Sequence, residues 1–576
     1  MKRPAKKRAS LREYKPQNQL AFDGFESPFG ALDPTNRWVK LSDLIPWDAL
    51  VNLYNKHHPP KGTGRPPVNS RVLIGSVIIK HLNDYDDRET IEQIRENIYL
   101  QYFLGFEGFS SDPPFDASLF VDIRKKLTPE LLQAINERLL GINQGVLLPD
   151  KKDLESEDEQ GPDQPDQEQT TFAESGSSSP EEPITHKGEL LMDATVAPQD
   201  IAYPTDLNLL NDSREMSEKI IDFLYLTYKQ KREETKELLV LLSKPDALSF
   251  SLNLAVEKAS CKQIIDTLST LKKPRTYRRI ARKDYLNTAQ SKKPSKRKIR
   301  LAVGKQLRYL RRNLGHIEEL LDLNDALGFS FPLPKDLHRY YWIIQLLYDQ
   351  QLEMFEERKR KVDNRLVSIH QPHVRPIVRG KAKASTEFGA KIHLSMIDGV
   401  AFLDVLSWDA FNEGTHLRSC VESYKSSYGY YPEKVLVDKI YANRENRKWL
   451  KQEGIKISAK PLGRPSAKAV ANHIRPGERN RIEGKFGQAK VAYGMNRIRA
   501  RLQQTSESWI ASIVLVLNLV NMARLAPYVQ YFETFSTPAR AFWAYILQPK
   551  RQMQPISTRN VISLPIQADL RPFQRV

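Results

Sequence analysis

Two short apolar segments that each end in an aspartate constrain the fold of this chain most. They are Glu189-Leu-Leu-Met-Asp193 and Lys434-Val-Leu-Val-Asp438, and both patterns predict β-strands. Strand patterning also occurs at Phe388–Met396, where an Asp398-Gly399 pair, a strong hairpin signal, leads into a partner strand over Ala401–Trp408. We therefore expect a sheet whose strands come from distant parts of the chain.

The order of the predicted elements narrows the fold further. After the hairpin, helices are predicted at about 412–425, 443–452, from 477 onwards and at 505–525, with one more strand at 455–459. Leaving aside a long helical stretch after the first strand, the order is strand, strand, strand, helix, strand, helix, strand, helix. This order predicts an α/β fold of the RNase H-like type, with a mixed sheet, covering helices and a large helical insertion. In that fold Asp193 and Asp438 lie side by side.

The predicted helix after residue 477 carries an acid between two cations. Arg479, Glu483 and Lys490 are spaced four and seven residues apart and share one helix face. The neighbouring stripe is apolar and would hold the helix on the sheet; it consists of Ile482, Phe486 and Ala489. In isolation such a face indicates a solvated ladder of salt bridges. After two strand-end aspartates it indicates an acid flanked by cations that bind phosphate.

This helix resembles the signature helix of bacterial insertion-sequence DDE transposases of the insertion sequence four/five type. There a tyrosine, an arginine, the catalytic glutamate and a lysine recur at fixed spacing, which Arg479, Glu483 and Lys490 match. Pro476 stands at the tyrosine position, and this departure concerns a phosphate or strand contact. The stretches LLMDATVAPQDIAYPTDLNLLNDSRE and VLVDKIYANRENRKWL resemble the same group. IRENIYLQYFLGF, inside residues 65–126, resembles its helical amino-terminal domain.

The resemblance implies a transposase that binds the element ends, cleaves DNA and joins the freed 3′-hydroxyl to target DNA. Asp193, Asp438 and Glu483 would be both catalytic residues and metal ligands, since three carboxylates suit the hard Mg²⁺ ion. Two Mg²⁺ ions are expected, with Asp193 bridging them and Mn²⁺ able to substitute. The alternatives are an RNase H-like nuclease without strand transfer and an inactive, domesticated DNA-binding relative. A homodimer or higher oligomer and a prokaryotic, nucleoid-associated cytoplasmic location also follow from the resemblance.

Several other side chains compete for these roles. Asp200 and Asp206 follow the first strand closely, but Asp193 is preferred because it ends the apolar run. Asp404 and Asp409 lie on or after the second hairpin strand and are expected to face solvent. His370-x-x-His373 has the spacing of metal ligands, but no further ligands with suitable spacing accompany it.

Charge is distributed unevenly along the chain. The formal net charge is +18, and the segment 150–182 carries −10, which leaves +28 on the remainder. A surface this positive favours nucleic acid as a partner, with a merely soluble basic protein as the alternative. The densest basic stretch lies in the helical insertion and supplies the candidate DNA-binding residues Arg278, Arg279, Arg282, Lys283, Lys296, Arg297 and Lys298. A solvated basic helix face is the other interpretation of that stretch.

The predicted domains are an extended basic segment (1–64), a helical domain for DNA binding or dimerisation (65–146), an acidic linker (147–186), a catalytic domain (187–526) with its insertion (207–365), and a tail (527–576). Within the insertion, Asp212 and Glu215 are expected to cap a helix. Cys261 and Cys420 are too few for a disulfide framework or a cysteine zinc site, which suggests an intracellular protein. The apolar stretch 509–525 contains two asparagines and is expected to be too short to span a membrane. Neither a membrane nor a small-molecule substrate is expected as a partner.

Overall fold

The computed structural model describes residues 32–59, 67–139, 185–243, 254–378, 386–458 and 476–523. The predicted tail and nearly all of the predicted acidic linker lie outside these ranges, as does the basic start of the chain.

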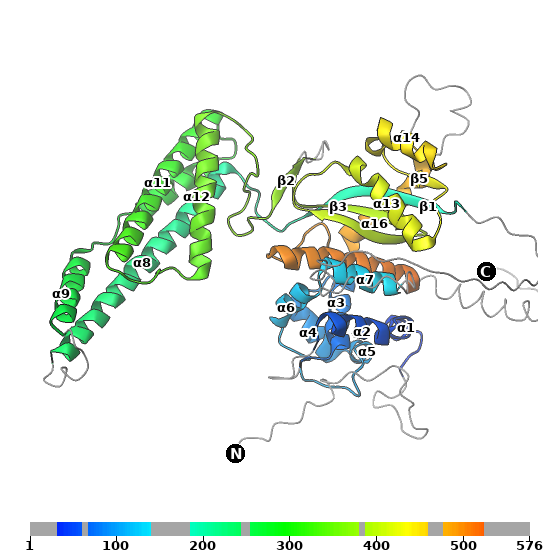
Figure 1. Ribbon diagram of the computed structural model, residues 1–576, viewed down its shortest axis with the longest axis horizontal. Helices are drawn as coiled ribbons and strands as arrows, with labels where there is room; N and C mark the ends of the chain where they lie inside the picture. The colour runs from blue at the N-terminus through cyan, green and yellow to red at the C-terminus, as the bar shows by residue number, and fades with distance from the viewer. Residues whose placement is uncertain are drawn as a thin grey trace, which may run out of the picture. The chain divides into compact units, whose positions relative to one another are not determined.

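Seven helices are described before the sheet, and they confirm a helical amino-terminal region (Figure 1). They are α1 (Arg37–Leu44), α2 (Trp47–His57), α3 (Ser70–Leu82), α4 (Asp87–Glu96), α5 (Ile98–Phe103), α6 (Leu119–Lys126) and α7 (Pro129–Leu139).

The prediction of an extended segment over residues 1–64 is wrong where α1 and α2 lie. Asn36 caps α1 by accepting a hydrogen bond from the backbone of Trp38. In α2, Trp47, Leu50, Val51 and Tyr54 follow helical spacing and are all buried. This short periodic stripe is the signal that sequence reasoning overlooked among the neighbouring prolines.

The catalytic-domain candidate is built on a six-stranded mixed sheet. Its strands are β1 (Glu189–Pro198), β2 (Arg375–Val378), β3 (Thr386–Ile397), β4 (Val400–Ser407), β5 (Lys434–Leu436) and β6 (Lys456–Ile457). The order is β2-β3-β1-β5-β6, and β4 also pairs with β3. β1, β5 and β6 are parallel, whereas β3 is antiparallel to β1. The mixed sheet and the adjacency of the first and fourth predicted strands are confirmed, and β2 was not predicted.

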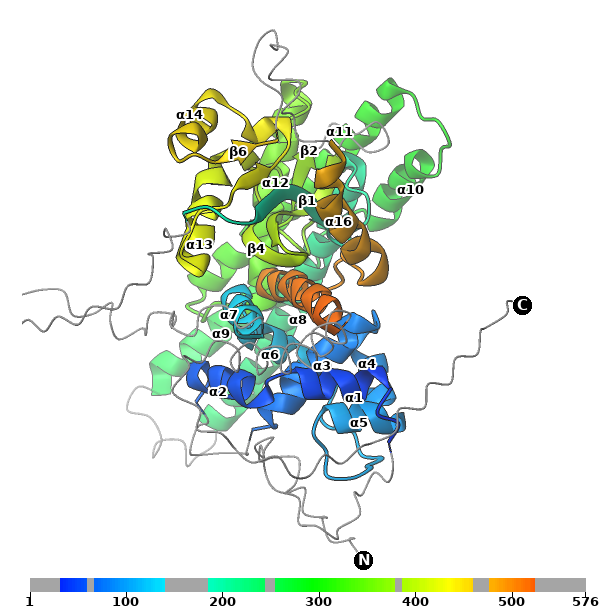
Figure 2. The same cartoon turned by 90° about the vertical axis from the view of Figure 1, so that its right-hand side faces the viewer.

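Helices cover both faces of the sheet (Figure 2). Leu190 and Met192 of β1 pack into a core with α13 (Leu417–Tyr428), which follows the short helix η2 (Glu413–His416). Because side chains alternate along a strand, Asp193 points to the opposite face. On that face, β1 is contacted by α16 (Asn480–Ala492). The short helix η4 (Pro476–Arg479) comes directly before α16. Its predicted apolar stripe is buried, which is confirmed for Ile482, Phe486 and Ala489.

The predicted helical insertion between β1 and β2 contains five described helices: α8 (Asp206–Leu242), α9 (Leu254–Thr270), α10 (Arg278–Ala289), α11 (Lys296–Ala326) and α12 (Lys335–Glu356). Buried apolar residues of α8, α11 and α12 form its core. The predicted cap at Asp212 and Glu215 is wrong, because α8 begins earlier. Thr205 is the actual cap and accepts a hydrogen bond from the backbone of Asn208.

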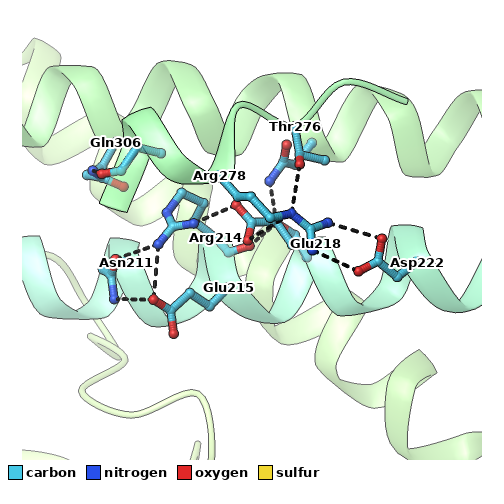
Figure 3. A network of polar contacts seen from close by, with 11 residues as sticks. Asn211, Arg214, Glu215, Glu218, Asp222, Thr276, Arg278 and Gln306 are labelled. Atoms are coloured by element: carbon cyan, nitrogen blue, oxygen red, sulfur yellow. Dashed lines mark hydrogen bonds and ion pairs between the residues drawn. The ribbon is translucent and has the colours of Figure 1, made fainter. Parts of the chain in front are cut away.

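A polar network ties α10 to α8 inside the insertion (Figure 3). Arg214, only 1% exposed, contacts Glu218 and donates to Asn211. Arg278 of α10 makes two 3.0 Å hydrogen bonds to the carboxylate of Asp222 on α8. These charge-assisted pairs fix the two helices relative to each other.

One described helix, Gln503–Ala523, is long and apolar enough to cross a membrane by length and composition, and 72% of its most apolar window is buried in the protein. The expectation that this stretch is too short is therefore wrong. Asn518 donates 2.7 Å and 2.9 Å hydrogen bonds to the carbonyl of Ala401 and to Asn136. These buried polar contacts identify it as a core helix, which joins the hairpin to α7.

Candidate active site

Asp193 lies in the middle of β1, not at its end as predicted, because the strand continues to Pro198. The residues after Asp193 include Thr195 and Val196, whose branched side chains favour extended backbone. The backbone N–H of Ala194 donates a 2.8 Å hydrogen bond to the Asp193 carboxylate. Burial raises the pKa of Asp193 despite this bond, and the negative charges of Glu413 and Asp438 add to the increase.

The pairing of β1 with β5 brings Asp438 to the same part of the sheet. Leu191 is in register with Leu436 in this parallel pair. Asp193 lies two residues further along β1, and Asp438 lies two residues beyond Leu436, just after β5 ends. This equal spacing carries both acids to the same side. Asp438 then caps the short helix η3 (Lys439–Tyr441) by accepting a 2.7 Å hydrogen bond from the backbone of Lys439.

Arg479 joins the acids of the site through its guanidinium group. Nη1 lies 3.0 Å from the Asp438 carboxylate, and Nη2 lies 2.7 Å from that of Glu483. The positive charge of Arg479 also opposes the increase in the pKa of Asp193. The structure thus brings Asp193, Asp438 and Glu483 around one arginine, which sequence reasoning had assigned to DNA phosphate.

The remaining candidate DNA-binding residues differ in exposure. Lys490 is partly exposed in the last turn of α16. Arg278 is bound to Asp222, so a phosphate contact would require breaking that pair. The other predicted residues of the insertion have exposed side chains: Arg279, Arg282, Lys283, Lys296, Arg297 and Lys298.

The competing acids after β1 have other partners. Asp200 lies 3.0 Å from Arg497, and Asp206 lies 2.7 Å from Arg365. Asp409 is 75% exposed, as predicted. Asp404 is also exposed as a residue, but its side chain is only 16% exposed and is bonded to His393 and Ser395 on β3, so the prediction fails for the carboxylate.

The His370-x-x-His373 pair has ordinary structural contacts. His370 interacts with the hydroxyl of Tyr340 at 2.9 Å, and the ring of His373 packs against Trp408. Burial lowers the pKa of His373 to about 4. In the part of the chain that the structure describes, neither histidine belongs to a cluster of metal-ligating side chains.

Sequence reasoning missed Glu413, an acid at the start of η2. Its side chain is 17% exposed and pairs with Lys391 at 2.8 Å. Its charge raises the pKa of both Asp193 and Tyr441, so it belongs to the electrostatic surroundings of the site. No local sequence pattern marks Glu413, because its ion-pair partner Lys391 lies on β3 and the acid it influences, Asp193, lies on β1.

The donor set fits a hard divalent cation. The candidate ligands are carboxylates, the oxygen donors that Mg²⁺ prefers. Asp193 is partly buried beside like charges, and a cation would relieve that repulsion, as the guanidinium of Arg479 does in part here.

Comparison with known proteins agrees with this geometry. Residues 435–520 match the family described as Transposase DDE domain, a range that includes Asp438, Arg479 and Glu483. Residues 28–126 match the family described as Transposase domain (DUF772), which covers α1 to α6. The chain contains two transposase domains. The DDE domain implies an RNase H-like fold, consistent with the order of the sheet.

One similar curated protein is "Uncharacterized protein ORF8 in nfe locus" from Rhizobium meliloti. It is 29% identical over 185 residues, which cover 32% of this chain and 72% of that protein. No solved structure is a significant match.

Proposed function

We propose that this protein is the DNA transposase of an insertion sequence, which binds the element ends, cleaves DNA and joins the freed 3′-hydroxyl end to target DNA. One observation carries the proposal: in a chain with a transposase DDE domain, strand register and Arg479 bring Asp193, Asp438 and Glu483 together. Asp193 lies outside the matched range, and its place beside Asp438 comes from the sheet alone.

Asp193, Asp438 and Glu483 would hold Mg²⁺, or Mn²⁺ in its place. When bound, a pair of such ions activates the attacking oxygen and neutralises charge on the phosphate and leaving group. The chain's own groups would orient the carboxylates and bind the DNA backbone. The N–H of Ala194 orients Asp193, and Arg479 exchanges its two carboxylates for the oxygens of a DNA phosphate. Lys490, two turns along α16, would bind the adjoining backbone.

DNA would also contact the exposed basic residues of α10 and α11. Arg279, Arg282 and Lys283 lie on α10, and Lys296, Arg297 and Lys298 form the first turn of α11. Phosphate contacts of this kind depend on salt and are independent of base sequence. Joining two element ends calls for a homodimer or larger oligomer, which we place in the prokaryotic cytoplasm on the nucleoid.

The test is cleavage of labelled DNA that carries the flanks of this protein's own gene, with Mg²⁺. Wild type should nick the element ends and join the 3′ ends to a target duplex, whereas Asp438→Asn and Glu483→Gln should do neither. Asp409→Asn, which removes an exposed acid outside the site, is the matched control and should keep activity.

Each alternative function has its own outcome in this assay. Nicking without joined products would instead identify a nuclease that lacks strand transfer. Binding of the ends by wild type without any nicking would identify an inactive DNA-binding relative.

A further inference from the structure

Three side chains of the kinds that bind metal ions converge on the face of the sheet that α13 covers, opposite the face to which Asp193 points. They are His393 on β3, Asp404 on β4 and Cys420 in the first turn of α13. One ligand atom from each lies within 4.8 Å of the others. His393 Nδ1 is 2.9 Å from the Asp404 carboxylate and 4.0 Å from the Cys420 sulfur. His393 and Cys420 are buried.

A local irregularity of the hairpin places the carboxylate there. The register of β3 with β4 passes from His393↔Val405 to Leu394↔Leu403, so Asp404 is the extra residue of a β-bulge. Bulges re-aim a side chain, and here the Asp404 side chain turns toward β3. Ser395 donates a 2.8 Å hydrogen bond to the second oxygen of Asp404 and fixes the carboxylate in place.

We propose that His393, Asp404 and Cys420 bind one divalent ion of the zinc class, in a site separate from the Mg²⁺ site. In a tetrahedral zinc site, ligand atoms about 2.0–2.3 Å from the metal are about 3.4–3.6 Å from one another. The observed separations of 2.9 Å and 4.0 Å lie on either side of this range. Shifts of about half an ångström would therefore bring His393 to binding distance with each of the other two. The third separation, between Asp404 and Cys420, is at most 4.8 Å and must shorten to the same range when the ion binds.

The donor set selects the class of ion. Nitrogen, sulfur and oxygen donors together suit zinc and its neighbours, whereas Mg²⁺ takes oxygen alone. His416, whose ring centre lies 5.9 Å from that of His393, is partly exposed and is the candidate for the fourth position. On binding, the Cys420 thiol releases its proton to solvent and its sulfur forms the bond to the metal, which itself stays divalent.

Such an ion would link β3, β4 and α13. Glu413 lies just before α13, in η2, and contributes to the electrostatics of Asp193. The zinc site would therefore be structural and would fix the segment that carries Glu413. The proposal does not depend on transposase activity, since the three ligands lie outside the carboxylate set assigned to Mg²⁺.

Cobalt(II) is the probe, because a cobalt–thiolate bond absorbs in the near ultraviolet whereas cobalt bound by carboxylates does not. The full-length protein, freed of metal and reduced, would be titrated with Co²⁺ in wild-type, Cys420→Ser and Cys261→Ser forms. Cys261, also buried but on α9, is the matched control. Wild type and Cys261→Ser should show the band at one ion per chain, Cys420→Ser should lack it, and Zn²⁺ but not Mg²⁺ should abolish it.

A second variant guards against misfolding of Cys420→Ser. Asp404→Asn keeps the thiol and the side-chain volume, and we expect it to bind Co²⁺ at least tenfold more weakly with the band still present. Absence of the band in wild type would overturn the proposal, whatever the variants do. So would a band that survives in Cys420→Ser or disappears in Cys261→Ser. Asp193→Asn should leave the band unchanged, which separates this site from the proposed active site.

Discussion

Replacing Arg479 by glutamine should tighten Mg²⁺ binding while it abolishes or weakens DNA cleavage. In the structure, Arg479 forms ion pairs with Asp438 and Glu483, two of the three proposed metal ligands. A metal ion that takes these carboxylates must displace the guanidinium. Glutamine is neutral and leaves the acids available, but it can no longer neutralise a DNA phosphate.

The expected gain in Mg²⁺ affinity follows from the exposure of the two carboxylates that pair with Arg479. The side chains of Asp438 and Glu483 are 57% and 52% exposed, so each pair is an exposed one. Exposed ion pairs contribute about 0.2–1 kcal/mol each. Two pairs give about 0.4–2 kcal/mol, so the dissociation constant for Mg²⁺ should fall by about 2- to 30-fold at moderate salt. High salt should reduce the difference, since exposed charges are screened.

Isothermal titration of Mg²⁺ into the protein without DNA measures this directly. Arg481→Gln is the matched control, because it removes the same charge from the same helix. The carboxylate partner of Arg481 is Glu189, which is not a proposed metal ligand. Equal or weaker Mg²⁺ binding by Arg479→Gln than by Arg481→Gln would refute the reasoning.

Three further predictions test the scaffold, the site's acidity and the basic surface. Arg214→Met should lower the free energy of unfolding in urea by about 3 kcal/mol, because it leaves the buried Glu218 without its main partner. This is near the low end for a broken buried pair, since Arg278 still lies 3.9 Å from Glu218. A loss under about 1 kcal/mol would contradict this. Because the pKa of Asp193 is raised, its carboxyl takes up a proton at pH values above 3.8, the ordinary pKa of an aspartate. Mg²⁺ affinity should therefore begin to fall at a higher pH than for an ordinary aspartate, and Asp193→Asn should remove that dependence. Replacing Arg282 and Lys283 by alanine should weaken binding of any DNA sequence and reduce the salt slope by about 0.9 per lost contact, measured by fluorescence anisotropy.

The sheet was predictable because its signals are local. Apolar runs predicted the central strands, and the Asp398-Gly399 pair predicted the hairpin, where both residues have positive φ (48° and 82°). The position of Asp193 was misjudged because the strand was taken to stop at the aspartate that follows its apolar run. The backbone of β1 continues instead through Pro198, paired with β3.

The misjudged surroundings of Asp404 have another physical cause: contacts that form only when strands pair. Asp404 was expected to face solvent from its place on the second hairpin strand, but a β-bulge turns its side chain toward β3. No local pattern marks that bulge, because its carboxylate is held by His393 and Ser395 from the neighbouring strand. The cluster with Cys420 was therefore invisible until the strands were paired.

Arg278 and Arg479 show why a basic residue's partner matters more than its charge. Both were predicted to bind phosphate, and both are bound to carboxylates in the structure. The partner of Arg278 is Asp222, which belongs to no proposed metal site and joins two helices, so that pair should persist when DNA binds. The partners of Arg479 are acids that a metal ion would take, so its pairs should be exchanged. Loss of Arg278 should therefore lower stability more than DNA affinity, and loss of Arg479 should lower cleavage more than stability.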